Sequence, residues 1–317
     1  FQYAAVAGFG FAVFFAVAYV GAFYYGGVDL PRAISFQAAE WPANAGPINP
    51  SYAIGVHYFG DYLATWLQSA APSPYITGSD VWASNYPPAL HLLFRPLTAL
   101  PYVTSLATYL TVSAVALLAP MWVATHRRSA AQRVLILVAG VVLTAPFLSV
   151  LDRGNAQGLV SGLIITSALL LVRRKDRWAA VCIGIAAALK GYPIIFVLLL
   201  LRRRQWTDSA IALAVFIGVT LLALLTFKGG VDANIRGMWD ATSPFRNLEV
   251  GNETVAPAFN SSMYSLLQVL AAAGTPGVAF ALGHYGFVAT LVLLAVVTIA
   301  LAPRATLAER LLALGTA

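Results

Sequence analysis

Three charged side chains in this chain have types that suit one reaction, namely Asp61, Arg153 and Lys190. A carboxylate within about 3 Å of a hydroxyl group can accept its proton as a general base. Two cations can hold a phosphate and stabilise the negative charge that develops as it departs. These residue types predict transfer of a group from a phosphate, with Asp61 as the base and Arg153 and Lys190 as phosphate ligands.

The elements that carry these residues are those of a membrane protein. Of the 317 residues, 60% are hydrophobic and 10% are charged, whereas soluble domains have about 45–50% apolar and about 25% charged residues. This composition excludes a soluble globule and predicts an all-α polytopic membrane protein, because helices satisfy their own backbone groups in lipid. The net charge of +7 falls in short clusters between apolar segments, which is typical of membrane topology rather than of nucleic-acid binding.

Apolar windows of about 20 residues predict about seven membrane spans in a single transmembrane domain over residues 1–317. The windows are residues 2–25, 103–125, 134–151, 156–172, 179–201, 210–227 and 287–302. Basic residues near position 304 followed by leucines resemble a loop that enters another span. We therefore expect further C-terminal spans that are missing from this chain.

Basic clusters predict the sidedness of the chain. Residues 126–133, 173–177 and 202–204 are rich in arginine, which the positive-inside rule places in the cytoplasm. The long segment 26–101 then lies outside the cytoplasm as the first loop, and helical spacing of apolar residues predicts surface helices at 51–68 and 89–97. We expect an integral plasma-membrane protein whose active site faces the extracytoplasmic side.

Two cytoplasmic clusters flank residues 179–201, a segment that is long enough for one crossing but not for two. The chain must therefore enter the membrane and return. The turn is predicted at Lys190-Gly191-Tyr192-Pro193, because proline cannot continue a helix. We expect a broken, re-entrant helix pair with Lys190 at membrane depth and facing a cavity. The turn Asp152-Arg153-Gly154-Asn155 joins two neighbouring spans and opens toward the same side.

Taken in order, the polar motifs resemble a known family, although each motif alone is weak. They are Gly60-Asp61-Tyr62, Asn85-Tyr86-Pro87-Pro88, Asp152-Arg153-Gly154-Asn155, Leu189-Lys190-Gly191-Tyr192-Pro193 and Asn260-Ser261-Ser262. The set is similar to glycosyltransferase family 87, which comprises polyprenol-phosphate-mannose-dependent mannosyltransferases of the GT-C architecture, prominent in actinobacteria. The resemblance implies the GT-C fold, a bacterial membrane, and an inverting single displacement without a required metal or other cofactor. Asp61 matches the base on the first extracytoplasmic loop.

The chain departs from the family pattern at three places. Ser261 stands where glutamine is usual, Gly191 stands where a bulkier residue is usual, and a later proline-tryptophan-histidine segment is missing. The first two departures bear on the identity of the donor sugar.

Several further residues are expected to support the site. His57 lies four residues before Asp61, so on one helix it would share a face with the base and could orient it. Asp152 could pair with Arg153, while the motif residues Asn155, Tyr192 and Asn260 complete the supporting set. The histidine spacings do not resemble a metal site, and no metal is expected.

The implied partners are a polyprenyl-phosphate sugar, a glycolipid or cell-wall glycan acceptor, and membrane lipids. A lipid-linked donor suits a site outside the cytoplasm, where nucleotide sugars are absent. Mannose and arabinose both remain open as the donor sugar, so the alternative enzyme is an arabinofuranosyltransferase. A transporter or flippase for a lipid-linked sugar, which would bind the phosphate with the same cations, is the alternative from another class.

Overall fold

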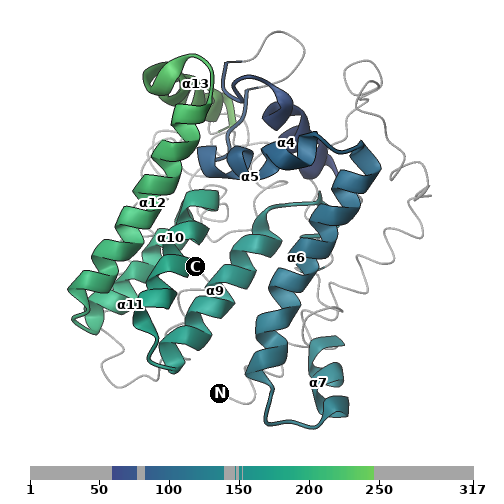
Figure 1. Cartoon of the computed structure of the whole chain (residues 1–317), viewed down its shortest axis with the longest axis vertical. Coiled ribbons are helices and arrows are strands. Elements are labelled where there is room, and N and C mark those ends of the chain that lie inside the picture. The colour runs from purple at the N-terminus through teal and green to yellow at the C-terminus, as the bar shows by residue number, and fades with distance from the viewer. Residues whose placement is uncertain (1–58, 77–82, 139–146, 148–149, 152, 246–317) are drawn as a thin grey trace, which may run out of the picture.

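The computed structural model describes residues 59–76, 83–138, 147, 150–151 and 153–245, and every element in this part of the chain is a helix (Figure 1). The elements are α4 (Gly60–Ala70), α5 (Pro88–Thr98), α6 (Tyr102–Ala124), α7 (Ala130–Leu137), α9 (Gln157–Val172), α10 (Asp176–Lys190), the 3-10 helix η3 (Tyr192–Phe196), α11 (Val197–Arg202), α12 (Trp206–Thr226) and α13 (Gly230–Phe245). The prediction of an all-helical chain is confirmed for these residues.

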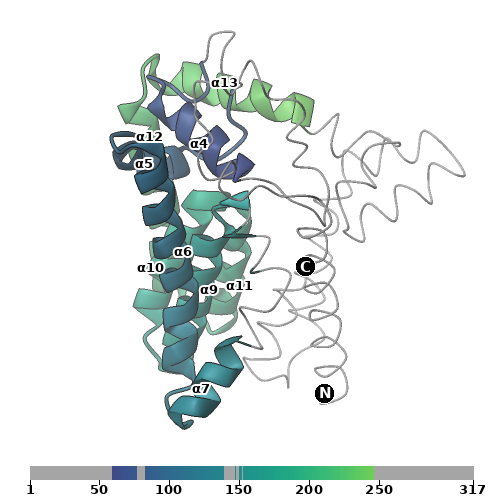
Figure 2. The ribbon, with the colours of Figure 1, turned by 90° about the vertical axis from the view of Figure 1, so that its right-hand side faces the viewer.

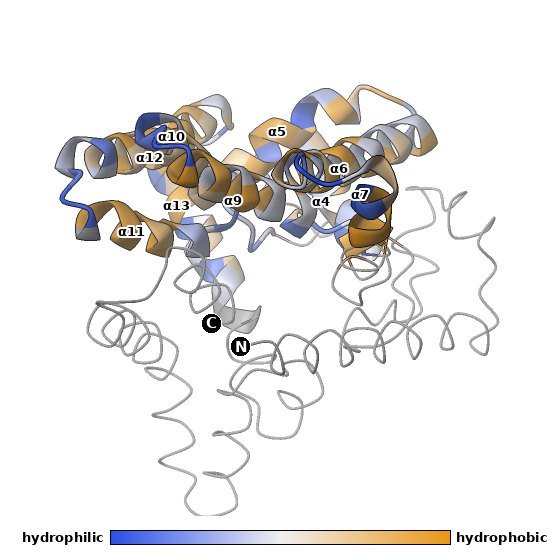
Figure 3. Ribbon diagram, turned by 90° about the horizontal axis from the view of Figure 1, so that it is seen from below, coloured by the Kyte–Doolittle hydropathy of each residue, from blue (hydrophilic) through white to orange (hydrophobic). Residues whose placement is uncertain are grey.

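The helices α6 and α12 are long and apolar enough to cross a membrane. They have 23 and 21 residues, so they are about 34 and about 32 Å long, against a hydrocarbon core of about 30 Å. Both present exposed aliphatic side chains, among them Val112, Val115, Ile217 and Leu222. Figure 3 shows the long helices mostly in the hydrophobic colour, as expected for surfaces that face lipid.

The long helices α6, α9, α10 and α12 lie side by side and pack through small residues (Figures 1 and 2). A Cβ added to Gly162 of α9 would lie 2.3 Å from the carbonyl oxygen of Ala116 in α6. A Cβ on Gly184 of α10 would lie 2.6 Å from the carbonyl oxygen of Ala212 in α12. Such close backbone approach at glycine is typical of helix packing in membranes.

The predicted spans agree with the structure to different degrees. The windows 103–125, 156–172 and 210–227 coincide with α6, α9 and α12 within a few residues. Window 134–151 begins inside α7, which starts earlier because Ser129 and Gln132 form a capping box. Most of the rest of this window, and the windows 2–25 and 287–302, lie outside the described residues.

The segment 179–201 is divided where the sequence places its turn. Helix α10 ends at Lys190, Gly191 has a positive φ of 75°, and η3 and α11 follow. Leu200 of α11 and Ala180 near the start of α10 belong to one buried apolar cluster, and α11 contacts α10, so the chain returns alongside that helix. With 15 residues, α10 is about 22 Å long, which ends it roughly 8 Å short of a complete crossing.

Two of the connections between helices have the same backbone form. Arg174, between α9 and α10, and Arg204, between α11 and α12, have φ of 58° and 57°. In each case the next residue donates its N–H to a carbonyl five residues earlier, which is a Schellman-type helix end. These arginine-rich connections lie at the end of the bundle opposite to α4, α5 and α13 (Figures 1 and 2).

Helices α4 and α5 pack across the other end of the bundle and are joined by a buried histidine. His91 of α5 hydrogen-bonds through Nδ1 to Ser69 Oγ of α4 at 2.8 Å and through Nε2 to Ser84 Oγ at 2.7 Å. Burial lowers the pKa of His91 to about 3. The histidine is therefore neutral at physiological pH and has a structural role.

The predicted surface helix 89–97 corresponds to α5, but the predicted helix 51–68 is wrong in its extent. Phe59 has a left-handed φ of 58° and accepts the first helical hydrogen bond, so α4 begins only at Gly60. A left-handed residue cannot belong to a continuous right-handed helix. Residues 51–58, including His57, lie outside the described residues.

Helix α13 was not predicted, since its sequence contains glycine, aspartate, asparagine and proline, which favour loops. Tertiary contacts hold it in place: Ser73 donates to the side chain of Asn234 at 2.6 Å, and Arg95 donates to the carbonyls of Pro72 and Thr226 at 3.0 Å each. These bonds connect the loop before α5 with the end of α12 and the start of α13.

Candidate functional site

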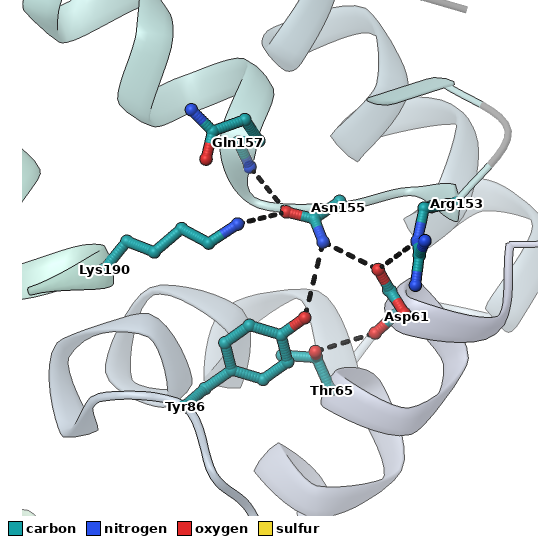
Figure 4. A network of polar contacts seen from close by, with 7 residues as sticks. All are labelled: Asp61, Thr65, Tyr86, Arg153, Asn155, Gln157 and Lys190. Atoms are coloured by element: carbon teal, nitrogen blue, oxygen red, sulfur yellow. Dashed lines mark hydrogen bonds and ion pairs between the residues drawn. The ribbon is translucent and has the colours of Figure 1, made fainter. Parts of the chain in front are cut away.

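Asp61 lies in the first turn of α4, beside the buried residues Tyr62 and Leu63. The ring of Tyr62 packs against Phe94 and Tyr109, and its hydroxyl hydrogen-bonds with Ser105. This packing fixes the first turn of α4 on the bundle. The side chain of Asp61 is 15% exposed and points toward the turn of residues 153–155 (Figure 4).

This turn supplies two donors to a single oxygen of Asp61. Arg153 Nε lies 2.9 Å from Oδ2 and Asn155 Nδ2 lies 2.6 Å from the same atom. Gly154 between them has a φ of 62°, and a Cβ there would lie 2.5 Å from the Cβ of Tyr62. Glycine therefore serves two purposes here, because it adopts the left-handed conformation and lets the turn approach α4 closely.

Lys190, the last residue of α10, belongs to the same network. Its Nζ donates to Asn155 Oδ1 at 2.9 Å, so the amide of Asn155 separates the lysine from Asp61 (Figure 4). The helix ends at this lysine because Gly191 leaves the helical conformation. The break in the segment 179–201 thus brings a cation to the end of the bundle that carries α4.

Two residues of the network were not predicted as part of a site. The hydroxyl of Tyr86 accepts a longer hydrogen bond of 3.4 Å from Asn155 Nδ2. Burial, and secondarily the charge of Asp61, raise the pKa of Tyr86, so this phenol keeps its proton. The backbone N–H of Gln157 donates to Asn155 Oδ1 at 2.9 Å, and its side chain donates to the hydroxyl of Tyr192 at 2.6 Å.

A sequence signal existed for Gln157, which stands two residues after Asn155 at the start of a helix, where an asparagine side chain commonly caps the backbone. Tyr86 stands in the motif Asn85-Tyr86-Pro87-Pro88, in which the prolines indicate a turn. Nothing in that motif shows that the phenol reaches a residue 69 positions later.

The structure brings four of the predicted site residues into one chain of polar contacts, namely Asp61, Arg153, Asn155 and Lys190. Tyr192 joins this chain through Gln157. His57, Asp152 and Asn260 lie outside the described residues. The predicted alignment of His57 with Asp61 stays a prediction, and the structure shows only that α4 begins at Gly60, after the left-handed Phe59.

The arrangement presents a carboxylate with one oxygen held and one oxygen left over. Both side-chain donors bind Oδ2, while Thr65 binds the backbone carbonyl of Asp61 at 2.7 Å. Within the described part of the chain, Oδ1 accepts no hydrogen bond. Such an oxygen can accept a proton from a hydroxyl group, and the neighbouring cations can bind an anion.

No group of three or more histidine, cysteine, aspartate or glutamate side chains that could hold a metal ion was found among the described residues.

Comparison with known proteins identifies a family. The family model of Glycosyltransferase family 87 matches residues 85–317. This segment contains Arg153, Asn155 and Lys190, whereas Asp61 precedes it. Neither the curated proteins nor the solved structures gave a match.

Proposed function

Because the chain belongs to glycosyltransferase family 87, and is therefore a membrane glycosyltransferase of the GT-C type, we propose that it transfers mannose from polyprenyl phosphate to an extracytoplasmic glycolipid or cell-wall glycan. The transporter alternative loses its support, because the family is one of enzymes. The donor sugar, the acceptor and the side of the membrane are parts of the proposal.

The observation that carries the proposal is the contact chain from Asp61 through Asn155 to Lys190, with Arg153 beside the carboxylate. In the proposed step, the acceptor hydroxyl oxygen forms a bond to the anomeric carbon, and its proton passes to Oδ1 of Asp61. The bond between that carbon and the phosphate oxygen breaks, and its electron pair leaves with polyprenyl phosphate.

A single carboxylate supports an inverting reaction. Retaining enzymes that use a covalent intermediate need a second carboxylate as nucleophile close to the first. Among the described residues, the side chains that donate to the carboxylate of Asp61 are a guanidinium and an amide instead. Direct displacement from the face opposite the phosphate therefore suits this site, and a β-linked mannosyl donor would give an α-mannoside.

The leaving phosphate needs positive charge where its negative charge increases. Lys190 supplies one such charge and the guanidinium of Arg153 supplies another, although Arg153 also holds Asp61 through Nε. Since two protein cations stand at the site, we propose that the reaction requires no metal ion.

The position of the site in the bundle supports an extracytoplasmic reaction. The basic clusters at 173–177 and 202–204 lie at one end of the bundle, and α4 with Asp61 lies at the opposite end (Figures 1 and 2). By the positive-inside rule, the arginine-rich end faces the cytoplasm. A donor with a lipid tail can reach this site from within the bilayer.

The test is sugar transfer by the purified chain in lipid nanodiscs. The donors are polyprenyl-phosphate mannose and polyprenyl-phosphate arabinose, both radiolabelled, and lipid and glycan acceptor fractions are counted separately. We expect wild type to use the mannose donor with less than a twofold change in the presence of EDTA. We expect Lys190→Gln to raise KM for the donor, because it removes a charge from the phosphate.

The controls separate the parts of the proposal. Transfer only from the arabinose donor would replace mannose by arabinose and leave the site assignment intact. Loss of transfer in EDTA that Mg²⁺ or Mn²⁺ restores would contradict the metal-free mechanism. Full activity of Asp61→Asn would remove Asp61 as the base, since loss of a general base lowers the rate by about 10²-fold or more.

A further inference from the structure

Asn155 makes four polar contacts with four different segments of the chain. Its Oδ1 accepts from Lys190 Nζ and from the backbone N–H of Gln157, both at 2.9 Å. Its Nδ2 donates to Asp61 Oδ2 at 2.6 Å and to the hydroxyl of Tyr86 at 3.4 Å. Only a primary amide offers an acceptor on one side and two donors on the other.

The backbone around Asn155 fixes the direction of this amide. Gly154 before it turns left-handed, and its N–H donates to the carbonyl of Leu151. The N–H of Gln157 at the start of α9 binds Oδ1. The oxygen must therefore face the helix start and the lysine, which leaves the amino group directed at Asp61 (Figure 4).

We propose that Asn155 is a positioning residue that links the proposed base Asp61 with the proposed phosphate ligand Lys190, so that proton acceptance and phosphate departure occur at a fixed separation. The inference rests on the proposed function for the roles of those two partners. Asn155 itself acts through them and need not touch the substrate.

The alternative is that Asn155 serves only as a cap for α9. A cap needs only an oxygen that accepts from the helix N–H, and aspartate or serine supplies it as well as asparagine does. Asn155→Asp therefore preserves the cap and the contact with Lys190. It replaces the donor that faces Asp61 with a second carboxylate oxygen, so it affects the proposed link and leaves the cap unchanged.

Two carboxylates in contact cannot both ionise readily, so one of them keeps its proton to higher pH. Among the described residues, the charged and titratable groups that interact with Asp61 are Arg153, Lys190 of α10, Tyr86 before α5 and Tyr109 of α6. All four are retained in Asn155→Asp. A change in the pH dependence of this variant would therefore report the new contact between residues 61 and 155.

The experiment compares wild type, Asn155→Asp and Asn155→Asp/Asp61→Asn by infrared titration in nanodiscs and by the pH profile of sugar transfer. The infrared band of protonated carboxyl groups needs no substrate. We expect Asn155→Asp to keep a carboxyl protonated about one pH unit or more higher than wild type does, and the double variant to lose this signal. We expect kcat of Asn155→Asp to fall about tenfold near pH 7. We also expect the acidic limb of its pH profile to shift to higher pH.

Asn155→Ser is the second variant, because it retains a capping oxygen but is too short to reach both Asp61 and Lys190. We expect it to lower kcat without the infrared signal. Wild-type transfer by Asn155→Ser, or an unchanged titration of folded Asn155→Asp, would reduce Asn155 to a helix cap. Activity in Asp61→Asn would contradict the proposed function, while the infrared titration would still decide whether Asn155 joins the two residues.

Discussion

Two aspartates, Asp61 of α4 near the end of helix α10 and Asp176 at the start of α10, have similar partners but different surroundings. Asp61 binds Arg153 at 2.9 Å and the amide of Asn155, while Asp176 binds Arg203 at 2.7 Å and the amide of Gln205. In both cases an arginine, a residue with a left-handed φ and an amide follow one another at the end of a helix. The same local turn thus presents two donors to a carboxylate on another element.

The two groups differ in the hydrogen-bond partners of their amide oxygens. Oε1 of Gln205 is buried and has no hydrogen-bond partner in the described part of the chain. Oδ1 of Asn155 accepts from Lys190 and from the start of α9. The polar contacts around Asp176 join the two connections between helices, because Arg203 also donates to the carbonyl of Leu171. The group at Asp61 continues to a further cation.

The left-handed residue also differs, and packing explains the difference. Arg204 is exposed. Gly154 faces Tyr62 so closely that even a methyl group would overlap it. The same turn therefore serves as a structural clamp at one end of the bundle, and close approach of α4 makes it part of a candidate active site at the other end.

Replacing each aspartate by asparagine should give the largest difference in kcat between the two groups. We expect Asp61→Asn to lower kcat by about 10²-fold or more, since the general base is lost. Asp176→Asn should leave kcat within about threefold and lower the free energy of unfolding by roughly 1–2 kcal/mol, as expected for a partly buried ion pair. Transfer assays and thermal melts of both variants in one nanodisc preparation measure this. Equal losses of activity would make the two groups equivalent.

Placing alanine at each left-handed position should give a smaller effect. Gly154→Ala introduces a Cβ at a positive φ, which costs about 1 kcal/mol or more relative to glycine, whereas Arg204→Ala shortens a side chain at a left-handed position that already has a Cβ. The new Cβ at residue 154 meets the Cβ of Tyr62, so α4 must shift and carry Asp61 with it. We expect roughly tenfold lower kcat for Gly154→Ala, because small displacements of catalytic groups are costly. Wild-type kinetics of Arg204→Ala is the matched control, and equal kinetics in both variants would refute the argument.

Much of the bundle follows from local sequence. Uninterrupted apolar windows predict α6, α9 and α12, because a membrane span needs little beyond length and hydrophobicity. The break after Lys190 follows from the proline three residues later and from the charge clusters on both sides. These are signals within about 20 residues of the feature that they predict.

The candidate site is less predictable, because its contacts are distant in sequence. Asp61 meets Arg153 and Asn155 across 92 and 94 positions. Residue types and the common side of the membrane indicate that Asp61, Arg153 and Lys190 belong together. They do not show that the amide of Asn155 stands between the base and the lysine. Likewise, helical spacing extends back to residue 51, and only the structure reveals the left-handed Phe59, after which α4 begins.

The smallest expected effect concerns pH and the end of the bundle that carries Asp61. The folded pKa of His91 is about 3, below its ordinary value of 6.5, so the folded state resists protonation that the unfolded chain accepts. Stability is therefore complete above about pH 6.5 and declines below it by up to about 1.4 kcal/mol per pH unit. From pH 7 to pH 5 this group should cost about 2 kcal/mol.

Hydrogen exchange by mass spectrometry at pH 7 and pH 5, corrected for the intrinsic rate, locates the change. Because His91 joins Ser69 of α4 to Ser84, we expect faster exchange in α4 at pH 5 and unchanged exchange in the connection around Asp176 and Arg203. His91→Gln retains hydrogen-bonding groups but has no proton to gain, so its α4 should exchange equally at both values. Equal acid sensitivity of α4 in wild type and His91→Gln would show that another group, and not this buried histidine, controls the stability of the helix that carries Asp61.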